Sequence, residues 1–183
     1  MGRKAMEGAQ ITVDELKLPI SVEEFNELID VEYRKVFANY IPLMPGAERL
    51  IRHLANKNIP IAVATSSKGF TFELKTRPHK ELFSKFHHIV IASEDKEIIR
   101  GKPDPQTFLV CAARFTEPPS PLDMSTVLIF EDSIAGVEAA NAAGAASVWV
   151  PDPRMPKDAV KPAVLLNSLE EFKPELFGLP AYD

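Results

Sequence analysis

Residues 127–133 are Val-Leu-Ile-Phe-Glu-Asp-Ser, and residues 134–144 continue as an alanine-rich segment that ends at Gly144. The four apolar residues predict a buried β-strand, because β-branched and aromatic side chains favour strands. The alanine-rich segment predicts a helix that is closed by a glycine in the left-handed conformation. Two carboxylates, Glu131 and Asp132, therefore lie where a strand stops and a helix begins.

These two carboxylates occupy the edge at which open α/β sheets bind their ligands. Strand-to-helix loops and helix N-termini converge at the carboxyl ends of parallel strands. Carboxylate oxygens suit a hard divalent cation, and we predict Mg²⁺ because it shares its sites with phosphate oxygens. The structural alternative is that Asp132 or Ser133 caps the helix and binds no ligand.

The remainder of residues 43–183 alternates helix and strand patterns. This alternation predicts an α/β fold with a doubly wound, Rossmann-like and mainly parallel sheet. The predicted strands span 59–64, 88–92, 127–130, 147–150 and 163–166. The predicted helices span 47–57, 70–83 with a break at Pro78, 106–114 and 134–144, and the capping-box spacing of 168–171 predicts a short last helix.

Residues 1–42 contain helix patterns only. An amphipathic run that ends near Pro19 predicts one helix, and Ser21-Val22-Glu23-Glu24 has the spacing of a capping box that opens a second. The second helix is expected to end before Pro42. We therefore predict a helical segment over 1–42 that is separate from an α/β core over 43–183.

Composition restricts the classes of partner. A net charge of −5 over 183 residues argues against binding to nucleic acid or to an acidic membrane surface. The single cysteine, Cys111, lies in an apolar run and is expected to be a buried thiol, so the chain fits a reducing, cytoplasmic compartment. No apolar run approaches the length of a membrane span, and the oligomeric state is left open.

Three loops bring chemically suited groups to the same predicted edge. Thr65 and Ser66 follow one buried strand, Lys102 lies on a loop stiffened by Pro103 and Pro105, and Glu131 with Asp132 follows another strand. Hydroxyls can bind phosphoryl oxygens, a lysine can neutralise their charge, and carboxylates can hold Mg²⁺. Each group alone is more often a helix cap or a surface charge, but their joint order indicates a phosphoryl-transfer site.

The chain resembles the haloacid dehalogenase superfamily of phosphatases over essentially its whole length. The family's second motif matches Thr65 with Ser66, its third matches Lys102 within Gly-Lys-Pro-Asp-Pro, and its fourth matches Glu131 with Asp132. The resemblance implies a magnesium-dependent phosphomonoesterase that acts on a small nucleotide, with an α-helical cap over its core. It also implies roles: Thr65 holds the phosphoryl group, Lys102 balances charge, and Asp132 binds Mg²⁺ with support from Glu131.

One motif of that family is absent. The family's first motif is an Asp-x-Asp that ends the first strand and supplies the nucleophile, and these 183 residues contain no Asp-x-Asp. Residues 1–42 resemble the second half of the family's cap. Without the nucleophile, the covalent route should be lost while electrostatic binding remains.

The same absence predicts a break in the sheet. In this family the first strand lies between the strand that ends at Thr65 and the strand that ends at Glu131. Its loss would leave these neighbours about 10 Å apart, because paired strands lie about 4.8 Å apart. Lost burial on the order of 10 kcal/mol would make the sheet marginal unless the two strands close up.

Four hypotheses for function follow. The first is a truncated form, or an incomplete gene model, of a longer phosphatase. The second is a catalytically inactive paralogue that binds phosphate, metal or a partner protein. A third, a receiver-like signalling domain, is disfavoured because such domains place the acid pair first and the hydroxyl later. A fourth is a sugar-phosphate mutase, which the surviving motifs do not separate from a phosphatase.

Overall fold

The computed structural model describes residues 5–116 and 123–183, so residues 1–4 of the predicted helical segment lie outside the described part. The main helices are α1 Ala5–Leu16, α2 Val22–Val36, α3 Ala47–Asn56, α4 Gly69–Thr76, α5 Lys80–Phe83, α6 Gln106–Ala113 and α7 Ile134–Ala142. The strands are β1 Ala62–Thr65, β2 His88–Ile91, β3 Leu128–Glu131, β4 Ala146–Trp149 and β5 Val164–Leu165. Short 3-10 turns cover Arg77–His79, Met124–Thr126, Leu169–Glu171 and Pro174–Phe177.

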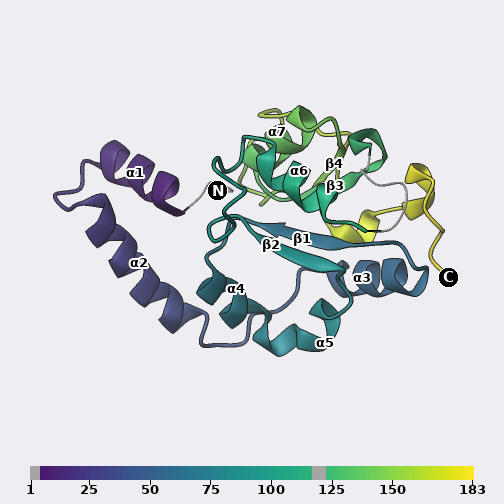
Figure 1. The fold of residues 1–183 in the computed structure, drawn as a ribbon, viewed down its shortest axis with the longest axis horizontal. Helices are drawn as coiled ribbons and strands as arrows, with labels where there is room; N and C mark the ends of the chain where they lie inside the picture. Colours follow the sequence, from purple (N-terminus) through teal and green to yellow (C-terminus); the bar gives the residue numbers. More distant parts are fainter. Residues whose placement is uncertain (1–4, 117–122) are drawn as a thin grey trace.

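Helices α1 and α2 form an arm that extends away from the strands (Figure 1). Ser21 caps α2 as predicted, because its side chain accepts a hydrogen bond from Glu24 N at 3.0 Å. Helix α1 buries Ala9 and Val13, whereas α2 buries none of its residues. Helix α2 is thus attached to the rest of the chain through partly exposed side chains, such as Asp30, which pairs with Lys68.

All strand pairs are parallel, as the sequence predicts, but the described strands form two sheets instead of one. One sheet has the order β1-β2, and the other has the order β3-β4-β5. In register, Thr65 pairs with Ile91 and Glu131 pairs with Trp149. The predicted break is therefore present: β1 and β3 belong to different sheets, and each has an edge without a strand partner among the described residues.

Helices pack on both faces of the strands, which confirms the α/β class. On one face, Phe108 of α6 and Ala139 and Ala140 of α7 pack on Ile129. On the other face, Leu50 and Leu54 of α3 pack with Val148 and Phe172. Figure 1 shows α6 and α7 on the side of the strands opposite to α3, α4 and α5. The carboxyl ends of β1 and β3 lie between these two groups of helices, and the predicted residues Thr65 and Glu131 are the last residues of these strands.

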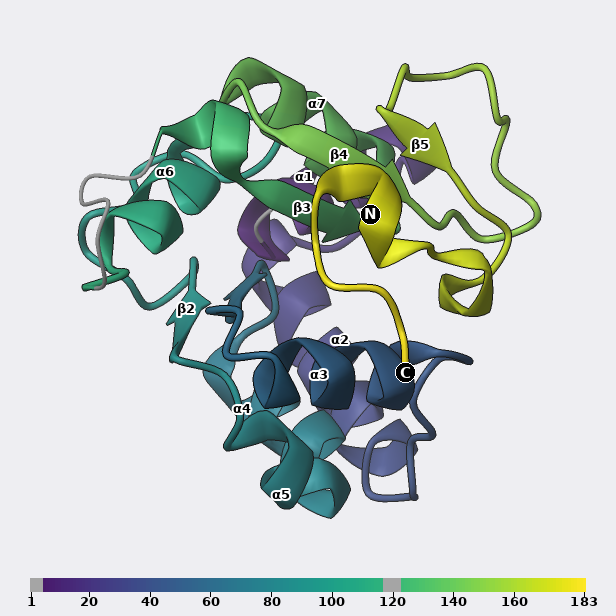
Figure 2. The same ribbon diagram turned by 90° about the vertical axis from the view of Figure 1, so that its right-hand side faces the viewer.

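The C-terminal part differs from the prediction. The expected last helix is only the 3-10 turn Leu169–Glu171, although Ser168 still caps it by accepting from Glu170 N. Phe172 leaves the turn in an extended conformation and is 2% exposed in the core, and Lys173 precedes a proline, which disfavours helix. Figure 2 shows this C-terminal segment running from β5 past α3.

Two smaller differences concern strand bounds. β1 begins at Ala62 rather than Ile59, because Pro60 has no backbone N–H to donate to a ladder. β5 is limited to two residues, Val164–Leu165. Across residues 5–116 and 123–183, no helix combines the length and the apolarity that a membrane span requires.

Candidate active site

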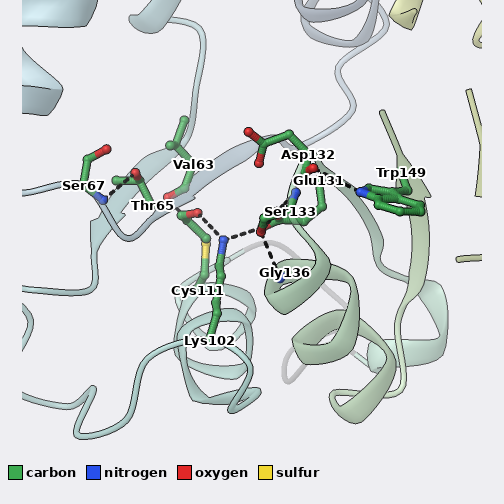
Figure 3. Close-up of polar contacts among 11 residues, drawn as sticks. Val63, Thr65, Ser67, Lys102, Cys111, Glu131, Asp132, Ser133, Gly136 and Trp149 are labelled. Atoms are coloured by element: carbon green, nitrogen blue, oxygen red, sulfur yellow. Dashed lines mark hydrogen bonds and ion pairs between the residues drawn. The ribbon is translucent and has the colours of Figure 1, made fainter. Parts of the chain in front are cut away.

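The structure brings Lys102 and Glu131 together at the carboxyl ends of the two sheets. Lys102 follows β2 and turns its side chain between β1 and β3 (Figure 3). Its Nζ donates to the backbone oxygen of Ala64 in β1 at 3.3 Å and to Glu131 Oε1 at the end of β3. One ammonium group thereby links two sheets that, within residues 5–116 and 123–183, share no strand.

This ion pair is enclosed. The side chains of Lys102 and Glu131 are each 6% exposed, and the Lys102 Nζ lies 4.5 Å from the centre of the Phe108 ring. Glu131 Oε2 also accepts from the Ser133 hydroxyl at 3.0 Å. A side chain at Gly136 of α7 would place its Cβ 2.0 Å from Glu131 Cδ, so the carboxylate needs a glycine at that position. The charge of Lys102 is thus matched by a buried carboxylate.

Asp132 has a different environment. It is exposed, and Figure 3 shows its carboxylate pointing away from Lys102. Its backbone oxygen accepts from Nε1 of the fully buried Trp149 at 3.1 Å, which fixes the turn into α7. Although the residue as a whole reaches solvent, the atoms packed around its carboxylate reduce its hydration, and this effect together with the adjacent Glu131 carboxylate raises the pKa of Asp132 above its usual value. A cation near this carboxylate would therefore be favoured.

The α7 cap is supplied by the neighbouring residue. Ser133 Oγ accepts from Gly136 N at 3.0 Å, so Ser133 and not Asp132 is the N-cap. The cap interpretation of the two-carboxylate stretch is therefore met by Ser133 alone, which leaves the Asp132 side chain available for another role.

The loop after β1 places its hydroxyl groups beside this centre. Thr65 is the last residue of β1, and its Oγ1 accepts from Ser67 N at 3.1 Å. Ser66 lies between them in the same loop. Ser67 Oγ in turn accepts from Lys75 Nζ at 2.7 Å. The Thr65 hydroxyl is thus linked through Ser67 to a lysine of α4.

Lys75 lies near this centre, although no motif of the sequence singles it out. It is partly buried, and burial lowers the pKa of its ammonium, while the charge of Asp132 acts in the opposite direction. The available signal was helical spacing, since Lys75 lies one turn beyond the buried Thr71 and so occupies the inward face of α4. A lysine on an inward face is uncommon unless it has a polar partner.

The donor set fits Mg²⁺ only in part. Within the described residues, no group of three or more His, Cys, Asp or Glu side chains could hold a metal ion. Glu131 is bonded to Lys102 and Ser133, so Asp132 is the carboxylate left for a cation. One carboxylate suffices for Mg²⁺ when water and phosphate oxygens complete its shell. The residues present are therefore compatible with a magnesium ion that arrives with a phosphorylated ligand.

A pocket of about 420 Å³ lies away from these groups. It is lined by side chains that include Tyr40, Leu43, Arg49, His79 and Glu170, and it contains none of the predicted site residues. We therefore place the candidate site at the strand ends, on the basis of their charged and hydroxyl groups, and not at this pocket.

A family model described as haloacid dehalogenase-like hydrolase matches residues 1–144. The chain belongs to this family. The match includes both the helical arm and the strand ends that carry Thr65, Lys102, Glu131 and Asp132.

Relatives of this haloacid dehalogenase-like hydrolase carry phosphatase names. A probable pseudouridine-5'-phosphatase of Drosophila melanogaster is 48% identical over 183 residues, which are 100% of this chain and 78% of that protein. The (DL)-glycerol-3-phosphatase 2 of Arabidopsis thaliana is 44% identical, over 100% of this chain and 76% of the relative. The (DL)-glycerol-3-phosphatase 1 of the same plant is matched over only 61% of its length.

Solved structures agree on the fold. A β-phosphoglucomutase from Clostridium difficile superposes with a TM-score of 0.75 at 22% identity, covering 97% of this chain and 76% of the other. A HAD hydrolase from Entamoeba histolytica superposes with a TM-score of 0.71 at 21% identity, covering 92% of this chain and 76% of the other.

Proposed function

We propose that the chain binds the phosphoryl group of a small phosphorylated metabolite, and that its site serves magnesium-dependent phosphomonoester hydrolysis. By family the chain is a phosphatase. The observation that carries the proposal is the position of Lys102, which joins Glu131 to Ala64 of β1, the strand that ends at Thr65. Pseudouridine 5'-phosphate is the first substrate to test, because the relative of that name matches the whole chain.

Each candidate site residue has a distinct role in this proposal. Thr65 and Ser66 bind phosphoryl oxygens through hydroxyl and backbone N–H donors at the end of β1. Lys102 holds positive charge at the base of the site, and Glu131 fixes its position. Asp132 is the residue that would hold Mg²⁺. Such an ion, when bound, neutralises charge on the phosphoryl oxygens.

The nucleophile is the part of this chemistry that the 183 residues do not supply. They contain no Asp-x-Asp, and the exposed Asp14 and the partly buried Asp30 lie on the helices of the arm. Covalent phosphoryl transfer needs a nucleophile in line with the leaving oxygen. We therefore expect the chain by itself to bind phosphate without turnover by that route.

A second function is favoured by the state of Lys102. Its Nζ is committed to Glu131 and to Ala64 O, so its positive charge is already matched before any ligand arrives. This arrangement suits a catalytically inactive paralogue that binds phosphate or a partner protein. The truncated form of an active phosphatase is the alternative, which a verified longer transcript encoding Asp-x-Asp upstream would favour.

One experiment separates these outcomes. Purified chain would be incubated with Mg²⁺ and either pseudouridine 5'-phosphate or glycerol 3-phosphate, with released phosphate measured and binding followed by calorimetry. We expect binding without release of phosphate. Hydrolysis that Asp132→Ala abolishes would mean that another residue replaces the nucleophile. Absence of both binding and hydrolysis would contradict the proposal.

A further inference from the structure

The lysines near the site differ in their partners. Lys102 is paired with Glu131, and Lys68 is paired with Asp30 of α2 at 2.6 Å. Lys75 Nζ instead donates to the neutral hydroxyl of Ser67 at 2.7 Å, and among the described residues no carboxylate forms an ion pair with it. Lys75 is thus the lysine of this group whose charge lacks a direct counter-ion.

The hydrogen-bond directions leave donors available. Ser67 Oγ accepts from Lys75, so its own proton can be donated to a further acceptor. Thr65 Oγ1 accepts from Ser67 N, so its proton can also be donated. An ammonium group has three N–H donors, of which Lys75 gives one to Ser67. Donors of three linked residues are therefore free to meet one anionic oxygen acceptor.

Charge balance at the strand ends favours a second ammonium group beside Lys102. Glu131 and Asp132 bring two carboxylates to the strand ends, and Lys102 matches one of them. A phosphate monoester that approached this centre without further positive charge would meet the Asp132 carboxylate. Lys75 already interacts electrostatically with Asp132 and so supplies the opposite charge on the side of the Thr65 loop.

The direction of the Lys75 ammonium differs from that of a lysine whose only role is to cover apolar surface. Long basic side chains usually bury their alkyl stem and extend the ammonium into water. The Lys75 ammonium instead turns toward the site, bonded to Ser67 and 5.5 Å from the centre of the Phe37 ring at the end of α2. Desolvating an ammonium beside a neutral partner costs free energy, which an incoming anion would recover.

We propose that Lys75 is a phosphate-binding residue of this site, which acts with Ser67 and Thr65 to take an anionic oxygen of the phosphoryl group. This inference rests on the proposed function, because it names the residue that supplies the free positive charge for the same ligand. The inference adds to the site a residue of α4 that lies outside the strand-end motifs.

Calorimetric titration of the full chain with inorganic phosphate, with and without Mg²⁺, tests the proposal. Lys75→Met should weaken phosphate binding roughly tenfold or more, because a charge-assisted hydrogen bond is lost. Lys75→Arg keeps the charge and should retain most of the affinity. Lys80→Met is the matched control, since Lys80 is an exposed lysine of α5, and it should bind like the unmodified chain. Ser67→Ala should weaken binding as well, and a thermal melt of each variant reports folding.

The outcomes separate this inference from the proposed function. If Lys75→Met binds phosphate as tightly as the unmodified chain while Thr65→Ala does not, the role of Lys75 is overturned and the proposed function stands. Loss of binding in Lys75→Met with a normal melt, restored in Lys75→Arg, supports the role. If the folded, unmodified chain binds no phosphate, both are overturned.

Discussion

Lys102 Nζ and Glu131 Oε1 form an ion pair between the two sheets, with each side chain only 6% exposed. Burial of two charges is costly, and it is tolerated here because each group has further partners: Ala64 O for the lysine and Ser133 for the carboxylate. The pair occupies the interval between β1 and β3, where no strand pairing exists among the described residues. It therefore connects the site to the stability of the whole core.

Removing one partner of this pair should be strongly destabilising. Lys102→Met leaves Glu131 as an unpaired buried carboxylate, and we expect a loss of about 3–5 kcal/mol in the free energy of unfolding. Urea denaturation followed by circular dichroism measures it. Lys35→Met is the control, because the Lys35–Glu32 pair is 64% and 59% exposed and should contribute less than about 1 kcal/mol. Equal losses of unfolding free energy in both variants would show that the buried pair stabilises the chain no more than the exposed pair does.

Gly136 should tolerate alanine poorly although it lies within a helix. Glycine-to-alanine changes in helix interiors usually stabilise by about 0.5–1 kcal/mol. At Gly136 the new Cβ would lie 2.0 Å from Glu131 Cδ, so the carboxylate must move and the bond to Lys102 must stretch. Gly8→Ala in α1 is the matched control, since nothing lies within 4 Å of its Cβ. Thermal melts should show opposite signs, and stabilisation by both changes would argue against a fixed Glu131.

The arm formed by α1 and α2 should loosen when Asp30 is replaced. The Asp30 carboxylate forms an ion pair with Lys68 Nζ at 2.6 Å. The Arg34 guanidinium of α2 lies 4.4 Å from the centre of the Phe70 ring. Because α2 buries none of its residues, these contacts carry much of its attachment. In Asp30→Ala, hydrogen exchange in α2 should quicken while the core keeps its protection. Asp14→Ala, which removes only an exposed bond to Gln10, should leave α2 unchanged.

His88 should make stability depend on acid pH. Burial lowers the pKa of His88, whose Nε2 lies 2.8 Å from the Cys111 carbonyl oxygen. Because the unfolded chain binds the proton more readily, stability falls as pH drops below about 6.5 and levels off below the lowered folded pKa. Melting temperatures of the unmodified chain and of His88→Asn, taken from pH 7.5 to 5, measure this difference. Parallel curves would mean that His88 does not contribute.

Much of the fold was predictable because local sequence and tertiary packing agree. The strand at 128–131, the cap at Ser133 and the left-handed Gly144, with φ of 81°, all match the pattern of residues 127–144. The parallel pairing followed from the alternation of helix and strand. The predicted last helix is longer than the observed 3-10 turn. The cap spacing at Ser168 carries no information on Phe172, which packs in the core in an extended conformation.

The strand-end positions of the candidate site residues were predictable, whereas the contacts between them were not. Thr65, Lys102, Glu131 and Asp132 stand at positions where the chain leaves a strand or a stiffened loop, which sequence reveals. The pairing of Lys102 with Glu131 and the approach of Lys75 to Ser67 depend on how two sheets and α4 pack. Sequence spacing alone does not determine such contacts, because they join segments that are distant along the chain.

The most direct test of the account is the effect of Mg²⁺ on phosphate binding by the unmodified chain and by Asp132→Ala. Calorimetry with inorganic phosphate, before and after removal of Mg²⁺ with a chelator, measures it. We predict that Mg²⁺ tightens phosphate binding in the unmodified chain and has no such effect in Asp132→Ala, which should still melt cooperatively. An equal effect of Mg²⁺ in both proteins, or no phosphate binding in the folded unmodified chain, would contradict the account.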